Sequence, residues 1–221
     1  MRSCFPASAE PGKEFTSVTY SNVYFREPES RADQTRMMSI VTTGPDTGYY
    51  VDVFRSRKER GGDKMHDYFY HNLGQSMTLT AADGTDLNLQ PTEELAFAGA
   101  HLYAYSYLYD KKMVATNKDV KATFTIDMKD KGGDDIYMNL WDEERTGKRE
   151  VFTALAPMTE GLSRTPGMPY NIKEQPTLTF VARQHGEAWN RPFVSVYEPS
   201  TKKEPSAIES VSYFDVEETD F

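Results

Sequence analysis

The feature that most constrains the fold is a recurring alternation of apolar and polar residues in short runs. In Val120–Met128 the side chains of Ala122, Phe124, Ile126 and Met128 share one face, because successive residues of a strand point to opposite faces. Similar runs recur between turn sequences such as Gly44-Pro45-Asp46 and Ala82-Asp83-Gly84. This pattern predicts an all-β fold, an antiparallel β-sandwich with at most one short helix. The strands expected are Phe15–Phe25, Arg36–Thr43, Tyr49–Arg55, Asp67–Leu73, Ser76–Thr80, His101–Tyr109, Val120–Met128, Ile136–Trp141, Arg149–Ala154, Thr177–Arg183, Phe193–Tyr197 and Ala207–Phe214.

The rest of the chain divides simply. Pro91–Ala100 predicts the short helix, with Thr92 as its N-cap and two glutamates in its first turn. Residues 1–13 are expected to form a flexible lead-in, 14–214 a single β-sandwich domain, and 215–221 an acidic tail.

The charge balance restricts the partners. The net charge of −9 argues against a nucleic-acid partner, since phosphate binding needs clustered Lys and Arg. No stretch approaches the roughly 18–20 apolar residues of a membrane span, and the N-terminus lacks the apolar segment of a signal peptide. The 14 Tyr and 12 Phe residues suit strands and contact with sugar rings. A polyanionic sugar would need a local basic patch, and Arg55–Arg60 is the dense one.

The segment Tyr49–Gly74 carries the most informative chemistry. If "HDYFYH" is a strand, His66, Tyr68 and Tyr70 point one way, and Asp67, Phe69 and His71 point the other. We expect Asp52 and His66 to be in contact, because a turn at Gly61-Gly62 would pair their strands as a hairpin. They are then either ligands of a metal such as zinc or a hydrogen-bonded pair that supports the sheet. His66, Tyr68 and His71 are the candidate catalytic residues, since Tyr and His can act as general acids or bases.

Two aromatic groups are candidates for sugar contact. In His101–Tyr109 the residues Tyr103, Tyr105, Tyr107 and Tyr109 would form a ladder along one strand face. In "VARQHGEAWNRPF" the residues Trp189 and Arg191 would sit at a hairpin tip. The alternatives are a tyrosine face packed on a neighbouring sheet and a purely structural hairpin. The candidate substrate-binding residues are Tyr70, Arg55, Tyr105, Trp189 and Arg191.

Two stretches also resemble a known family. "YYVDVFRSR", the Gly61-Gly62 pair and "HDYFYHNLG", followed by "TLTFVARQHGEAWNRPFVSVYEP", resemble the C-terminal β-sandwich of heparinase II/III-like polysaccharide lyases, the group that includes oligoalginate lyases. "REVFTALAP" at Arg149–Pro157 is also similar to that region. The resemblance spans roughly residues 38 to 214.

This resemblance implies a lyase that eliminates across a uronic acid linkage, with a Tyr as base and acid. Most of the catalytic groups of such enzymes lie on a helical toroid that the present sequence does not contain. Some members bind zinc in the sheet domain through His, Asp and His. Asp52 and His66 would supply the last two, whereas Arg36–Thr43 has no histidine for the first.

The preferred interpretation is a substrate-facing or supporting domain of a lyase acting on uronic-acid glycans, without turnover of its own. The alternatives are an autonomous carbohydrate-binding module and a small Tyr/His-dependent lyase. The expected partners are an acidic polysaccharide or oligosaccharide and a helical lyase domain or a second copy of the chain. A periplasmic or cell-surface location is implied by the resemblance.

Overall fold

The computed structural model describes residues 2–4, 17–58, 62–96, 100–144, 147–158 and 166–213. It contains two antiparallel sheets, which confirms the predicted all-β sandwich. The larger sheet has eight strands in the order β1-β2-β3-β4-β13-β10-β9-β6, and the smaller has five in the order β5-β12-β11-β8-β7. Their bounds are β1 Arg2–Cys4, β2 Val18–Arg26, β3 Asp33–Thr42, β4 Gly48–Arg57, β5 Met65–Asn72, β6 Ser76–Ala81, β7 Gln90–Pro91, β8 Tyr109–Thr116, β9 Val120–Ile126, β10 Ile136–Asp142, β11 Arg149–Ala156, β12 Thr177–His185 and β13 Ala188–Thr201.

Consecutive strands repeatedly change sheet. The links β4–β5, β8–β9, β10–β11 and β12–β13 each pass from one sheet to the other. The turn at Gly186 therefore joins the two sheets, and the hairpin predicted there is wrong. Gly186 has a φ of 85°, a left-handed conformation that favours glycine.

The core lies between the two sheets. Phe124 of β9, Phe180 of β12 and Phe193 of β13 are fully buried there, together with Leu140 and Val151. Ala122 and Phe124 face this core as the alternation predicts. The strand ends at Ile126, so the predicted row does not continue to Met128 as strand.

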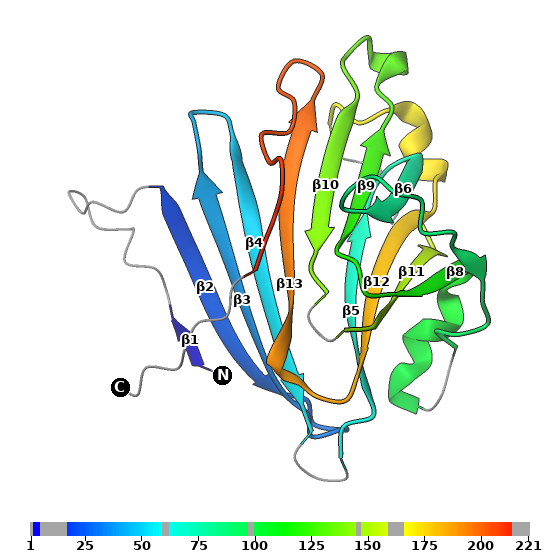
Figure 1. The fold of residues 1–221 in the computed structure, drawn as a ribbon. Helices are drawn as coiled ribbons and strands as arrows, with labels where there is room; N and C mark the ends of the chain where they lie inside the picture. Colours follow the sequence, from blue (N-terminus) through cyan, green and yellow to red (C-terminus); the bar gives the residue numbers. More distant parts are fainter. Residues whose placement is uncertain are drawn as a thin grey trace.

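A second, smaller core covers the outer face of the five-stranded sheet. Leu95, Phe152 and Val181 pack there with Phe69 and Tyr105. A 3-10 helix, Ala100–Tyr107, lies beside this sheet (Figure 1), in place of the strand predicted over His101–Tyr109. Residues 92–96 are not helical, and 97–99 lie outside the described residues, so the short helix predicted at Pro91–Ala100 is wrong where it can be compared. Two further 3-10 helices are Lys129–Lys131 and Tyr170–Glu174.

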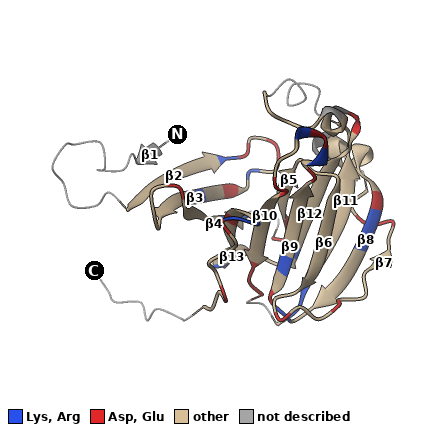
Figure 2. Ribbon diagram, turned by 90° about the horizontal axis from the view of Figure 1, so that it is seen from above, with Lys and Arg blue, Asp and Glu red and all other residues tan. Residues whose placement is uncertain are grey.

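The large sheet extends beyond the small one. β2 and β3 project to one side together with part of β4, without a described strand of the five-stranded sheet over them (Figures 1 and 2), whereas Tyr68 of β5 covers β4 at Asp52 and Phe54. The uncovered inner face of these three strands, formed by Val23, Phe25, Met38, Ile40 and Tyr50, is called the ledge below. Phe25, Met38 and Ile40 are 48%, 44% and 45% exposed. Among the described strands β5 pairs only with β12, so its other edge is free. It lies beside the ledge, because the Tyr68 ring of β5 is 5.7 Å from the Arg36 guanidinium of β3.

Near both ends of the chain the structure differs from what the sequence predicts. Arg2–Cys4, inside the expected lead-in, pair with Asn22–Tyr24 of β2 as the outermost strand. No strand forms over 207–213 of the strand expected at Ala207–Phe214, and Phe214 lies outside the described residues.

Candidate functional site

A buried polar cluster lies where the ledge meets the sandwich. Asp52 on β4 accepts hydrogen bonds from Arg36 Nε at 3.0 Å to both carboxylate oxygens. Its Oδ2 also accepts from Arg36 Nη2 at 2.5 Å and from the Tyr68 hydroxyl at 2.7 Å. The Tyr68 hydroxyl shares a further hydrogen bond with that of Tyr197 on β13. Asp52 is completely buried, whereas the Arg36 side chain reaches the surface at the ledge.

Register explains why these residues meet. Arg36 of β3 lies opposite Phe54 of β4, so the two share the inner face with Asp52, two residues away. Tyr68 reaches the same point from the smaller sheet and packs its ring 5.7 Å from that of Phe193. The cluster therefore ties β3, β4, β13 and β5 together across the two sheets.

The protonation of the cluster follows from its burial. Desolvation raises the pKa of Tyr68 well above its ordinary value, and the neighbouring Tyr197 and Asp52 raise it further. Desolvation also raises the pKa of Tyr197. The hydrogen bond to Asp52 raises the pKa of Arg36, which keeps the guanidinium charged. Tyr68 is thus a fixed hydrogen-bond donor that is 2% exposed, a poor position for a base that must reach a sugar proton.

A second set of buried polar residues continues from this cluster toward the beginning of β13 at Ala188. Ser195 donates to Asp142 Oδ2 at 2.8 Å, and Arg149 Nη1 donates to Asp142 Oδ1 at 2.8 Å. Arg149 Nη2 donates to Gln184, whose amide donates to the backbone carbonyl of Glu187. Burial raises the pKa of Asp142 although Arg149 opposes the shift. Arg36, Asp142, Arg149 and Tyr197 were not among the predicted site residues. The available signal for the first three was a charged residue at the end of a strand-like run, and Tyr197 carried no such signal.

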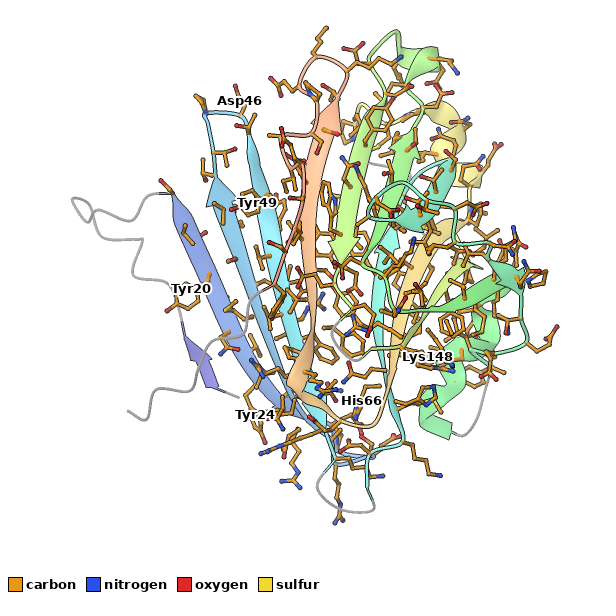
Figure 3. The ribbon with its side chains drawn as sticks, in the orientation of Figure 1. Tyr20, Tyr24, Asp46, Tyr49, His66 and Lys148 are labelled. Carbon is orange, nitrogen blue, oxygen red and sulfur yellow. The ribbon has the colours of Figure 1, made fainter. Side chains whose placement is uncertain are left out.

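His66 does not meet Asp52. Its Nε2 lies 2.6 Å from Asp63 Oδ1, which also accepts from the backbone N–H of Lys58 at 2.6 Å. His66 lies at the beginning of β5, at the lower end of the sandwich in Figure 3. The predicted contact fails because β4 and β5 belong to different sheets and do not form the expected hairpin.

The outer face of β5 holds a separate cluster. Arg183 donates from Nε to Asp67 Oδ1 at 2.7 Å and from Nη2 to Asp67 Oδ2 at 2.9 Å. Tyr105 donates to the same carboxylate at 2.5 Å. His71 lies beside Thr179 at 2.8 Å, and desolvation lowers the pKa of His71. Tyr105 therefore holds the 3-10 helix on the sheet and is not part of a tyrosine ladder.

Tyr68 and Tyr70 share one face of β5, as the alternation in "HDYFYH" predicts, but this face points into the core and not toward a sugar-binding surface. The Tyr70 ring packs 4.6 Å from that of Tyr197 and 5.4 Å from that of Phe124. Desolvation raises the pKa of Tyr70 to about 12. The candidates His66, Tyr68, Tyr70 and His71 therefore do not line one common surface.

The remaining candidates gather at the β12–β13 turn. The Arg57 guanidinium lies 4.3 Å from the centroid of the Trp189 ring, and Arg55 Nη1 donates to the Trp189 backbone carbonyl. The Glu187 carboxylate accepts from the backbone N–H of Trp189 at 2.5 Å. Arg191 is exposed nearby in sequence. We call Arg55, Arg57 and Trp189 the arginine–tryptophan group.

Comparison with known proteins gives one informative match, and no family model matches the chain. Over 191 residues the chain is 33% identical to a protein named endo-acting ulvan lyase from Formosa agariphila. The match covers 85% of this chain and 22% of that relative, so the chain spans about a fifth of its length. The chain is related to a polysaccharide lyase. The narrower resemblance to heparinase II/III-like lyases stays a prediction.

The residues do not fit the zinc site that this resemblance implies. Both carboxylate oxygens of Asp52 accept hydrogen bonds from the Arg36 guanidinium. A guanidinium has no lone pair with which it could itself bind a metal. His66 is bonded to Asp63 instead. Across the described residues, no three His, Cys, Asp or Glu side chains are grouped so that they could hold a metal ion. Asp52 and His66 are therefore not arranged to act together as metal ligands in this structure.

The structure also bears on the membrane. No helix within the described part of the chain has the length and apolar character needed to span a bilayer.

Proposed function

We propose that the chain is a supporting, substrate-facing domain of a polysaccharide lyase acting on uronic-acid glycans, and that it is not catalytic alone. The single observation that carries the proposal is the match of 85% of the chain to about a fifth of a lyase. The contacts of the candidate catalytic residues support it. Elimination needs a base near the sugar proton and a cation on the carboxylate in one cleft, and Tyr68 is enclosed between the sheets.

The ledge is the surface that would support another part of such a lyase. Its apolar residues are exposed on a sheet face, and an apolar groove of about 340 Å³ lies there, lined by Val23, Phe25, Arg36, Met38 and Phe54 among others. Exposed apolar areas of this kind are normally covered by a partner. The exposed apolar surface that supports this proposal is formed by residues of β2–β4, and Tyr68 is not part of it.

The first experiment is turnover by the purified chain on ulvan and on other uronate-containing glycans, followed by the ultraviolet absorbance of the unsaturated uronate. We expect no product. Elimination that disappears in Tyr68→Phe would make the chain an enzyme and overturn the proposal.

A second experiment tests the supporting role. The Formosa agariphila lyase without its matching segment is mixed with this chain, and complex formation is measured by analytical ultracentrifugation. We expect a complex that Met38→Asp weakens at least tenfold, while the matched control Met65→Asp, an exposed methionine on β5, leaves it unchanged. Equal effects of the two substitutions would exclude the ledge as the contact.

An autonomous carbohydrate-binding module is the second candidate, and the arginine–tryptophan group favours it. An aromatic ring beside guanidinium groups can stack on a sugar and attract its carboxylate. Titration calorimetry of the isolated chain with ulvan oligosaccharides tests this. Binding that is lost in Trp189→Ala, and kept in the exposed-aromatic control Tyr107→Ala, would favour this candidate.

A further inference from the structure

We propose that the guanidinium of Arg36 takes the place of a metal ion in this chain, as a built-in cation that neutralises the buried Asp52. The family resemblance assigns a metal to the sheet domain. Here the corresponding charge is supplied by the protein itself, from β3, one of the strands that form the ledge.

The hydrogen bonds around Asp52 carry the proposal. Arg36 donates to both carboxylate oxygens from two nitrogens, and Tyr68 adds a third donor to Oδ2. A planar guanidinium facing a carboxylate in this way is a strong, directional ion pair. A carboxylate that is completely buried needs such a partner, because an isolated buried charge is very costly.

The groups around Asp52 do not allow Arg36 and a metal ion to neutralise this carboxylate together. A divalent ion at Asp52 would lie against the positive charge of Arg36, and like charges at this distance repel strongly in a buried site. The histidine that the family pattern would bring to Asp52 is held by Asp63. The guanidinium and a metal are therefore alternatives.

The position of Arg36 also connects this ion pair to the ledge. The Arg36 side chain is 45% exposed and lines the ledge groove with Met38 and Phe54, while its contacts with Asp52 and the Tyr68 ring lie inside. Arg36 thus links the uncovered strands to the sandwich. A domain that covers the ledge would cover this ion pair as well, and would strengthen it by removing water.

The test is thermal unfolding of the purified chain, followed by circular dichroism, together with metal analysis by mass spectrometry. We expect the wild-type chain to carry no stoichiometric zinc and to keep its Tm when zinc or a chelator is added. Arg36→Met leaves Asp52 without its cation and should lower Tm by roughly 5–10 °C. The matched control is Arg26→Met, because Arg26 is about as exposed as Arg36 but makes a longer contact of 3.8 Å with Asp33, which keeps its hydrogen bond from the Tyr24 hydroxyl; its Tm should change little.

A double variant separates charge from packing. Arg36→Met with Asp52→Asn removes both charges, so it should recover part of the Tm lost by Arg36→Met alone. If Arg36→Met does not fold, folding of the double variant supports the proposal and its failure contradicts it. Stoichiometric zinc that raises the wild-type Tm and is lost in Asp52→Asn would overturn the proposal. So would an Arg36→Met variant as stable as Arg26→Met.

Discussion

The Tyr68 hydroxyl donates a hydrogen bond to Asp52 Oδ2 over 2.7 Å, although the two residues belong to strands of different sheets. This bond places a candidate catalytic tyrosine in the interior, where it holds a carboxylate that Arg36 also binds. Tyr68 of "HDYFYH" therefore serves to join the two sheets.

Removing the Tyr68 hydroxyl should destabilise the chain. Tyr68→Phe leaves the buried Asp52 and Tyr197 with one hydrogen-bond partner fewer, which costs about 1–3 kcal/mol. Urea unfolding measures this loss. Tyr20→Phe is the control, since Tyr20 is exposed on β2 and points away from the sheet in Figure 3; its stability should not change. Equal stability of the two variants would show that the Tyr68 bond contributes nothing.

The inward-facing tyrosines should make the fold sensitive to alkali. Desolvation raises the pKa of Tyr70 from 10.0 to about 12 in the folded chain. The folded state then binds this proton more tightly than the unfolded state, so stability is complete below pH 10 and falls as pH rises toward 12.

Urea midpoints across this pH range, together with the absorbance of ionised tyrosine, measure the effect. Tyr70→Phe should show a shallower decline than the wild-type chain. An identical decline in both would mean that Tyr70 ionises as freely in the fold as outside it.

Among the residues that the alternation predicts to face the core, Phe124 should lose the most stability when it is replaced by alanine. It is fully buried between the sheets, so Phe124→Ala should cost roughly 3–5 kcal/mol. Phe25→Ala deletes the same ring from the exposed ledge and should change the stability of the isolated chain little. Chemical denaturation compares the two. Similar losses would mean that the ledge is packed in solution.

Strand positions could be predicted from the sequence because alternation and turn residues are local signals. Ile136–Trp141 was expected and Ile136–Asp142 is observed. Sheet membership could not be predicted, since a turn such as Gly186-Glu187 serves equally well within one sheet or between two. Only the packing of the complete core decides between them.

The candidate site was predicted in part, for the same reason. Asp52 and Tyr68 were singled out, but Tyr197 comes from a strand 129 residues away from Tyr68, and the register of β3 on β4 that brings Arg36 to Asp52 was not predicted. Likewise, alternation predicted a strand over His101–Tyr109, yet Tyr105 donates a hydrogen bond to Asp67 on β5, and residues Ala100–Tyr107 form a 3-10 helix. Long-range contacts overrule local pattern in such polar segments.

A buried ion pair and an exposed one should differ in their contribution to stability. Arg183 and Asp67 are each 6% exposed and share two hydrogen bonds. Arg183→Met leaves the buried Asp67 carboxylate without its cation, so it should lower the free energy of unfolding by about 3–5 kcal/mol. Lys129 and Asp127 form an exposed pair at 2.9 Å, and Lys129→Met should leave the urea midpoint unchanged. Because Tyr105 donates to the same Asp67, Arg183→Met should also make the 3-10 helix Ala100–Tyr107 more accessible to limited proteolysis. A protected helix in a destabilised Arg183→Met variant would show that Asp67 alone retains it.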